Sequence, residues 1–369
     1  MYKLQLLLRR TLHRSKMLFS FLLGCIVFVE VANAQSALKF YSADHPFIQY
    51  TGRIDFTNPM LPRFWQPGVS VSFQFKGKDC AVILNDEILW GSNHNYLEIV
   101  VDGKAYRLQT KNRIDTIYLS SYVSAAKIHS AVIVKNTEAN IGYLELVGVL
   151  SKKLVKPLAK PVRKIECIGN SITCGTGADI SEVPCGKGKW QDQHNAYFSY
   201  GAIMARKLNA QVHLSSVSGI GLMHSCCNLG ITMPQVFDKI SMRNDTIQWD
   251  FAKYQPDVVT ICLGQNDGVQ DSTMFCNSYV KFVKQLRTYY PQTSFVLISS
   301  PMADDRLRNF MQRMLPAVEE QLHQSGENKV YTHIFFKQYS SGCDYHPSLT
   351  EHELIAEELS VVVQKIMNW

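Results

Sequence analysis

The sequence predicts a two-part α/β protein. An all-β, jelly-roll-like sandwich precedes a three-layer α/β/α part built on a parallel sheet. Residues 36–150 hold short strand-like runs separated by turns, with no long helical period, whereas strand-like and helix-like runs alternate over residues 165–369. Between them, residues 151–164 carry two prolines and six Lys/Arg residues, which predicts an extended, solvated linker.

The first 34 residues have the features of a signal peptide. A basic head precedes the apolar run Met17–Val29, and Ala32–Ala34 has the small-x-small pattern of a cleavage site. A membrane anchor is the alternative, but the run is short for a span and Glu30 interrupts it. A lipid anchor at Cys25 is a second alternative, although the residues that follow it are apolar rather than polar. We therefore expect export to the periplasm or the extracellular space.

The charge balance argues against nucleic acid as a partner. The whole chain carries 38 basic and 31 acidic residues, a net charge of +7. Without residues 1–34, 33 basic and 30 acidic residues remain, so the net charge falls to +3. Such a small, dispersed excess does not predict a nucleic-acid surface. No later apolar run is long enough to predict a stable membrane span.

Cysteine usage fits an exported chain in which some residues pair. Cys167 and Cys262 lie in apolar strand-like runs, which predicts packed thiols. His224 lies near two cysteines but lacks zinc-finger spacing, so no metal site is predicted. The disulfide candidates, whose pairing the sequence leaves open, are Cys174, Cys185, Cys226, Cys227, Cys276 and Cys343.

In the first part, alternating apolar and polar residues predict half-buried strands. Val69–Phe75 alternates and ends at a turn over Lys76–Asp79. Tyr96–Val101 runs into Asp102-Gly103, a pair typical of a β-hairpin. The pattern continues at 132–134 and 143–147.

The second part alternates strand-like and helix-like runs, which predicts a parallel sheet with helices on both faces. The predicted strands are 165–168, 212–214, 258–263, 295–298 and 330–336. The predicted helices lie near 197–209, 273–289, 304–324 and 349–367, the last capped by Ser348 or Thr350. In such sheets the functional site lies at the carboxyl ends of the strands.

Four candidate residues follow predicted strands and therefore belong at one sheet edge. They are Ser171 after the first, Gly219 after the second, Asn266 after the third and His346 after the fifth. A serine nucleophile, an imidazole base and N–H donors to an oxyanion are the parts of an acyl-transfer hydrolase. The sequence thus predicts this chemistry, with Ser171 as nucleophile and His346 as general base.

Each assignment has a simpler alternative. Ser171 could be an ordinary helix N-cap, and Asn266 a turn residue. As donors to the oxyanion, Asn266 would offer its side-chain N–H and Gly219 its backbone N–H, with Gly221 as the near alternative. The backbone N–H of Ser171 would be the third donor. Pro347 and the helix after it set His346 apart from the other histidines. Asp344, two residues before the histidine, is the weakest candidate for orienting it.

These segments resemble the blocks of the SGNH (GDSL-like) hydrolases over roughly residues 165–369. Gly169-Asn170-Ser171 has Asn where many members have Asp, and Gly264–Asp267 fits the third block. In the last block, Cys343 stands where members carry Asp, three residues before the histidine. The resemblance leaves two arrangements open: a Ser–His dyad with a backbone carbonyl orienting His346, or a role for Asp344.

Further segments resemble carbohydrate esterase family 2 over nearly all of the mature chain. They are Thr51–Phe56, Trp65–Val69, Val101–Gly103, Ser218–Gly221 and Gly342–Ser348. This resemblance implies a jelly-roll-like domain before an SGNH domain, removal of acetyl groups from polysaccharides such as xylan and glucomannan, and no metal or organic cofactor. It also implies aromatic side chains that hold sugar rings. Trp190 is the first candidate and Tyr345 the second, while Trp65 belongs either at a domain contact or in the sandwich core.

Taken with the predicted catalytic residues, this resemblance implies an exported carbohydrate O-acetyl esterase acting on acetylated polysaccharide or oligosaccharide. A lipid esterase or lysophospholipase of the same superfamily is one alternative, although no apolar lid is evident. A glycan-binding protein without catalysis is the other. The intact Ser171, Asn266 and His346 argue against it.

Overall fold

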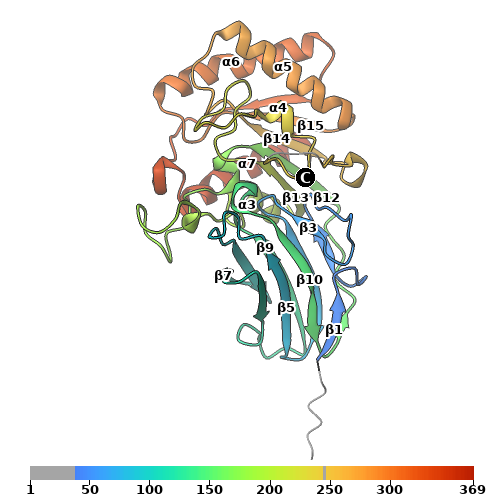
Figure 1. Ribbon diagram of the computed structural model, residues 1–369. Helices are drawn as coiled ribbons and strands as arrows, with labels where there is room; N and C mark the ends of the chain where they lie inside the picture. Colours follow the sequence, from blue (N-terminus) through green and yellow to red (C-terminus); the bar gives the residue numbers. More distant parts are fainter. Residues whose placement is uncertain (1–37, 244–246) are drawn as a thin grey trace, which may run out of the picture. The chain divides into compact units, whose positions relative to one another are not determined.

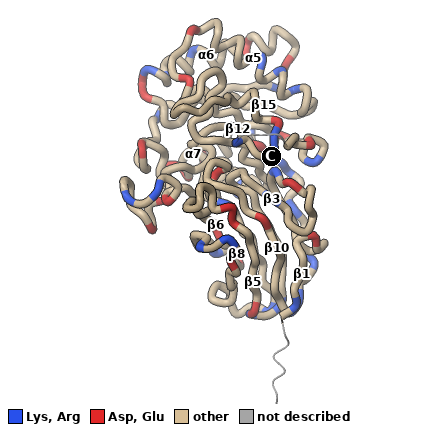
Figure 2. The backbone as a smooth tube through the Cα atoms, in the orientation of Figure 1, with Lys and Arg blue, Asp and Glu red and all other residues tan. Residues whose placement is uncertain are grey.

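The computed structural model describes residues 38–243 and 247–369. The predicted signal peptide and the alternative lipid anchor at Cys25 lie outside the described residues. Within those residues, no helix has both the length and the apolar character needed to cross a membrane. Figure 2 shows basic and acidic residues interspersed along both parts of the described chain.

The first part is a sandwich of two antiparallel sheets, as predicted. One sheet contains β1 (Lys39–Ser42), β10 (Leu144–Ser151), β5 (Cys80–Asp86) and β8 (Ile114–Tyr118) in that order, with β3 (Arg63–Phe64) beside β10. The other contains β11 (Leu154–Val155), β4 (Ser70–Lys76), β9 (Ile128–Lys135), β6 (Tyr96–Val101) and β7 (Lys104–Gln109), with β2 (Gln49–Thr51) beside β4. Strands β1, β10 and β5 are seen side by side in Figure 1.

Alternation along β4 builds the sandwich core. Val71, Phe73 and Phe75 are buried, while the polar residues between them are half-buried on the other face. The predicted hairpin joins β6 to β7 at Asp102-Gly103, where both residues have positive φ, 50° and 81°. Two-residue hairpin turns favour this conformation because it matches the twist of the strands.

The second part is a five-stranded parallel sheet between two layers of helices, again as predicted. Its strand order is β13 (Ala210–Ser216), β12 (Arg163–Gly169), β14 (Val258–Cys262), β15 (Ser294–Ile298) and β16 (Val330–His333). Helices α5 (Ser272–Tyr289) and α6 (Asp305–Gln324) pack on one face. Helices α3 (Tyr200–Lys207) and α7 (Leu349–Met367) pack on the other (Figure 1).

Two segments differ from their predictions. Strand β16 ends at His333 rather than near residue 336, because the Phe335 N–H leaves the ladder and donates to Ser299 Oγ at 2.8 Å. The expected linker is not wholly solvated, because Leu154 is buried. Leu154–Val155 forms β11 on the sandwich, and β12 already begins at Arg163.

A buried boundary joins the sandwich to the α/β part. Arg53 of the sandwich forms a 2.8 Å ion pair with Glu166 of β12, and both side chains are buried. Tyr290 donates a 2.5 Å hydrogen bond to the same carboxylate. Trp65 packs with Trp249 in an apolar cluster drawn from both parts. Trp65 therefore lies at the domain contact, the first of its two predicted locations.

Within residues 38–243 and 247–369, two disulfides form, Cys185–Cys343 and Cys226–Cys227. Cys167 and Cys262 are buried free thiols, as predicted. The other free cysteines in the described residues are Cys80, Cys174 and Cys276. Two of the disulfide candidates, Cys174 and Cys276, are therefore buried thiols that form no disulfide within the described residues.

Candidate active site

Residues from four separate strand ends line one cavity of about 720 Å³ at the carboxyl edge of the parallel sheet. Ser171, Gly219, Asn266 and His346 all contribute to its wall, as does Asp344. The structure therefore brings the sequence-predicted residues together at the sheet edge expected for this architecture.

The strand–turn–helix segment after β12 presents Ser171. The short helix α2 (Ser171–Cys174) begins at this serine, and the preceding Asn170 is its N-cap, accepting the Ile172 N–H at 3.1 Å. The N-cap alternative for Ser171 is therefore wrong. Gly169 has no room for a Cβ atom, which would collide with the Thr173 side chain. The serine is 7% exposed and lies on the cavity wall.

Three N–H groups are available near Ser171. Within the described chain, no hydrogen bond is made by the backbone N–H of Ser171 or of Gly219. Gly219 has φ +82°, a conformation that side chains with a Cβ disfavour, and its carbonyl accepts the Cys226 N–H at 2.8 Å. Asn266 uses one amide hydrogen to donate to the Ile220 carbonyl at 2.7 Å, which leaves its second hydrogen for another acceptor.

Asp267, which the sequence did not single out for a role, fixes the loop after Gly219. Its carboxylate accepts the backbone N–H groups of Leu222, Met223 and His224 at 2.9, 2.6 and 3.0 Å. The loop after β14 thus holds the loop after β13, so Asn266 and Gly219 keep a fixed spacing.

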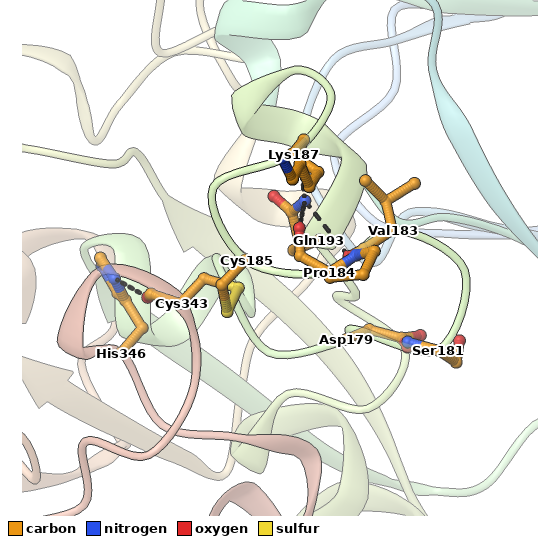
Figure 3. Close-up of a disulfide and its surroundings, with 9 residues drawn as sticks. All are labelled: Asp179, Ser181, Val183, Pro184, Cys185, Lys187, Gln193, Cys343 and His346. Carbon is orange, nitrogen blue, oxygen red and sulfur yellow. Dashed lines mark hydrogen bonds between the residues drawn. A yellow bond between two sulfur atoms is a disulfide. The ribbon is translucent and has the colours of Figure 1, made fainter.

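His346 is held by its own backbone turn. Its Nδ1 lies 3.2 Å from the Cys343 carbonyl oxygen (Figure 3). A carbonyl can only accept, so Nδ1 carries the proton and Nε2 keeps its lone pair. Burial lowers the pKa of His346, and the bond to Cys343 opposes that shift. Among the described residues, no hydrogen bond joins His346 to Ser171 or to the exposed Asp344 carboxylate.

A disulfide anchors the histidine turn. Cys185, in the long loop after α2, is bonded to Cys343, whose carbonyl faces the His346 ring (Figure 3). The Cys343 N–H also donates to the Gly177 carbonyl at 2.8 Å. A Cβ on Gly177 would lie 2.6 Å from the Cys343 oxygen, so only glycine permits this approach.

Exposed aromatic side chains surround the cavity. Trp190 at the start of η2 (Trp190–Gln193) lines it and is 44% exposed. Tyr345, 79% exposed, lines an adjoining cavity of about 520 Å³ that shares Gln265 and Met302 with the first. Both aromatic candidates predicted from the sequence are therefore at or beside the cavity.

Sequence reasoning missed Trp90, which the sandwich contributes. This residue lies in the β5–β6 loop, lines the same cavity and is 84% exposed. Arg243 of the α/β part pairs with Glu87 at the base of that loop at 3.0 and 3.1 Å, and Lys189 donates to the Ser92 carbonyl. The local sequence gives no signal for this role, because nothing near Trp90 specifies which turn faces the α/β part.

The described residues contain no group of three or more His, Cys, Asp or Glu side chains arranged to hold a metal ion.

Two family models match successive parts of the chain. The carbohydrate esterase 2 N-terminal model matches residues 50–161, and the GDSL-like lipase/acylhydrolase model matches residues 167–348.

Two curated proteins are similar over most of the chain. The cellulase/esterase CelE of Acetivibrio thermocellus is 33% identical over 344 residues, which cover 88% of this chain and 40% of that protein. The chain thus spans less than half of that relative's length. An acetylxylan esterase/glucomannan deacetylase of Cellvibrio japonicus is 26% identical over 370 residues, covering 96% of this chain and all of that protein.

Solved structures agree over both parts of the chain. A family two carbohydrate esterase from Clostridium thermocellum, in complex with cellohexaose, matches with a TM-score of 0.79 and 30% identity, covering 87% of this chain and 99% of that one. A family two carbohydrate esterase from Cellvibrio japonicus matches with a TM-score of 0.81 and 25% identity, covering 90% and 99%. The chain therefore belongs to carbohydrate esterase family 2 and is a carboxylic ester hydrolase.

Proposed function

We propose that this chain is an exported carbohydrate O-deacetylase that releases acetate from polysaccharides such as xylan or glucomannan, with Ser171 as its nucleophile. The observation that carries the proposal is the shared cavity: Ser171, Gly219, Asn266 and His346 come from four strand ends and line one wall. Those are the groups that acyl transfer from an ester to water requires.

In the first half-reaction, His346 Nε2 takes the proton from Ser171 Oγ as that oxygen attacks the acetyl carbonyl carbon. The bond to the Cys343 carbonyl fixes the tautomer in which Nε2 can accept it. The hydrogen bond between Ser171 and His346, which the structure does not contain, forms when substrate fills the cavity, since catalytic hydrogen bonds often tighten only in the substrate complex.

The tetrahedral intermediate places negative charge on the former carbonyl oxygen. The N–H groups of Ser171 and Gly219 and the second amide hydrogen of Asn266 are free to donate to it. Collapse breaks the bond to the sugar oxygen, which receives the proton from His346, and leaves an acetyl-serine. Water, deprotonated by the same histidine, then hydrolyses this ester to acetate and free Ser171.

We assign the orientation of His346 to the Cys343 carbonyl, which makes the catalytic unit a Ser–His dyad. The Asp344 side chain is exposed, and its backbone lies in a tight turn with φ 52°. Its charge lies close enough to oppose the fall in the pKa of His346, without a side-chain hydrogen bond. An Asp344→Asn variant should therefore keep most of the wild-type kcat, whereas a triad aspartate would not.

The substrate class rests on the exposed aromatics and on the relatives. Trp90, Trp190 and Tyr345 offer flat apolar faces at the cavity and its neighbour, which suits stacking against sugar rings. One relative bears the name acetylxylan esterase/glucomannan deacetylase, and another was solved with cellohexaose. Export rests on the signal-peptide features of residues 1–34.

The test is acetate release from acetylated xylan and from acetylated glucomannan by the mature protein, with Ser171→Ala measured alongside. We expect release that disappears in the variant, and the two rates rank the substrates. Release that survives Ser171→Ala would reject serine catalysis. A folded wild-type protein that releases no acetate from either substrate would reject the deacetylase proposal.

A further inference from the structure

One acidic side chain of the sandwich is buried against two segments of the candidate active site. Glu138 lies between β9 and the short helix η1 (Ala139–Ile141), and it is completely buried. Its carboxylate contacts residues of the α/β part that lie about 36 and 80 positions further along the chain. None of the reaction steps described above uses this group.

Glu138 bonds to both segments that carry the reacting groups. Its Oε2 accepts the Ser218 N–H at 2.6 Å, and Ser218 immediately precedes Gly219. The same oxygen accepts the Cys174 thiol at 3.3 Å, and Cys174 is the last residue of the helix that begins at Ser171. One carboxylate oxygen thus joins the nucleophile helix to the loop that supplies an oxyanion donor.

These contacts restrict the peptide that bears the Gly219 N–H. Ser218 is held at its backbone N–H by Glu138 and at its hydroxyl by Thr176, with 2.9 Å between the two hydroxyl oxygens. On the other side, the Gly219 carbonyl accepts the Cys226 N–H at 2.8 Å. With Ser218 fixed on one side and the Gly219 carbonyl on the other, the Gly219 N–H has little freedom to turn away.

Glu138 is itself held rigidly. The Nζ atom of Lys135, which is fully buried, donates to the Thr137 carbonyl at 2.7 Å and to the Glu138 carbonyl at 3.1 Å. The Asn136 side chain donates to Glu98 at 3.0 Å and accepts the Tyr197 N–H at 3.0 Å. The segment 135–138 is therefore held rigidly by hydrogen bonds from both parts of the chain.

We propose that Glu138 is a positioning residue for the oxyanion hole: by accepting the Ser218 N–H, it aims the Gly219 N–H at the oxygen that becomes charged. This inference rests on the proposed function, because it concerns the transition state of the same acyl transfer. It gives the sandwich a part in the chemical step itself, in addition to any contact it makes with substrate.

The structure indicates which substitutions separate this role from simple packing. Glu138 Oε1 has no hydrogen-bond partner among the described residues, so an amide nitrogen can stand there while the amide oxygen replaces Oε2 as acceptor. Burial raises the pKa of Glu138, which favours the neutral acid that an amide resembles. Glu138→Gln keeps the acceptor, whereas Glu138→Leu keeps the approximate volume and removes it.

The test measures kcat and KM of wild type, Glu138→Gln and Glu138→Leu with 4-nitrophenyl acetate and with acetylated xylan. Because a donor displaced by about 1 Å costs roughly a hundredfold in rate, we expect kcat of Glu138→Leu to fall about ten- to a hundredfold with KM nearly unchanged. Glu138→Gln should keep kcat within about threefold of wild type, since its amide oxygen still accepts the Ser218 N–H.

A boronic acid that forms a tetrahedral adduct with serine supplies a second readout. Its Kd should rise in Glu138→Leu by about the same factor as kcat falls, because the adduct resembles the transition state. The matched control is Glu145→Leu, which removes another buried carboxylate of the sandwich that bonds Arg63 and Asn85 and contacts neither the oxyanion loop nor segment 135–138. Unfolding midpoints and near-ultraviolet circular dichroism of every variant report whether it is folded.

Each outcome decides the matter. A folded Glu138→Leu with wild-type kcat and boronate affinity would overturn the inference while leaving the proposed function intact. Equal losses in Glu138→Gln and Glu138→Leu would also overturn it, since the acceptor would then not be the important feature. A Glu145→Leu variant that loses kcat as strongly would reduce the effect to general packing. A wild-type protein inactive on both esters would overturn the proposed function, and this inference with it.

Discussion

Removing the Cys185–Cys343 disulfide should cost both stability and activity. The change is Cys185→Ser, chosen because Cys185 is exposed and its replacement leaves no cavity. The bond joins positions 158 residues apart. In the chain-entropy model, closing a loop of that length removes about 17 cal/mol/K from the unfolded chain, or about 5 kcal/mol at 25 °C. Measured losses are usually about 2–5 kcal/mol, which is the range we expect.

The effect on activity should be smaller than the effect on stability. The histidine turn keeps two backbone bonds without the disulfide, from Cys343 N–H to the Gly177 carbonyl at 2.8 Å and from Gly342 N–H to the His346 carbonyl at 2.7 Å. Because these bonds still hold the turn, we expect the imidazole to shift by less than about 1 Å and kcat to fall by about three- to tenfold.

Urea unfolding followed by tryptophan fluorescence measures the stability change, and turnover of 4-nitrophenyl acetate at 25 °C measures kcat. Lys187→Ser is the matched control, because it places the same new side chain at another exposed position of the loop that carries Cys185 and leaves the disulfide intact. The reasoning fails if Cys185→Ser unfolds within about 0.5 kcal/mol of wild type, the range of ordinary surface substitutions. It also fails if the control loses as much as the variant.

Burial lowers the pKa of His346 below its ordinary value of 6.5, and the imidazole must be neutral to act as the base. We therefore expect kcat/KM for an acetyl ester to stay constant at neutral pH and to fall only below pH 6.5. A fall in kcat/KM with its midpoint above pH 6.5 would contradict the assignment of His346 as the base. Trp90→Ala should raise KM for an acetylated xylo-oligosaccharide about three- to tenfold through lost stacking, with Trp90→Phe restoring most of it and 4-nitrophenyl acetate turnover unchanged in both. A general loss on both substrates would instead indicate disruption of the loop. Glu166→Gln should lower the free energy of unfolding in urea by about 3–5 kcal/mol, because it leaves the buried Arg53 guanidinium without its counter-charge, and a loss below 1 kcal/mol would refute that account.

Most of the fold could be predicted because its signals are local. Strand β4 alternates along its length, and the helices α5, α6 and α7 follow apolar periods that end within a few residues of the predicted bounds. The errors lie where tertiary contacts override the local pattern. Phe335 leaves the sheet for Ser299, and Leu154–Val155 joins the sandwich although prolines and lysines surround it.

The residues of the candidate active site also divide into those with a local signal in the sequence and those placed by tertiary contacts. Ser171, Asn266 and His346 could be placed together because the carboxyl ends of parallel strands share one edge. Trp90 and Glu138 could not, because both come from sandwich loops whose position depends on how the two parts pack. The disulfide of Cys343 could not be predicted either, because its partner is 158 residues away and six candidate cysteines allow many pairings.

The buried boundary limits how this enzyme can be rebuilt. Arg53 of the sandwich forms an ion pair with Glu166 of the α/β part. Glu138 of the sandwich accepts the N–H of Ser218, which precedes Gly219. A hybrid carrying the sandwich of another esterase would therefore need an equivalent of both side chains, in the same register, to be stable and active. The tip of the Trp90 loop takes part in neither contact, so it is the part of the sandwich that can be exchanged while the boundary stays intact.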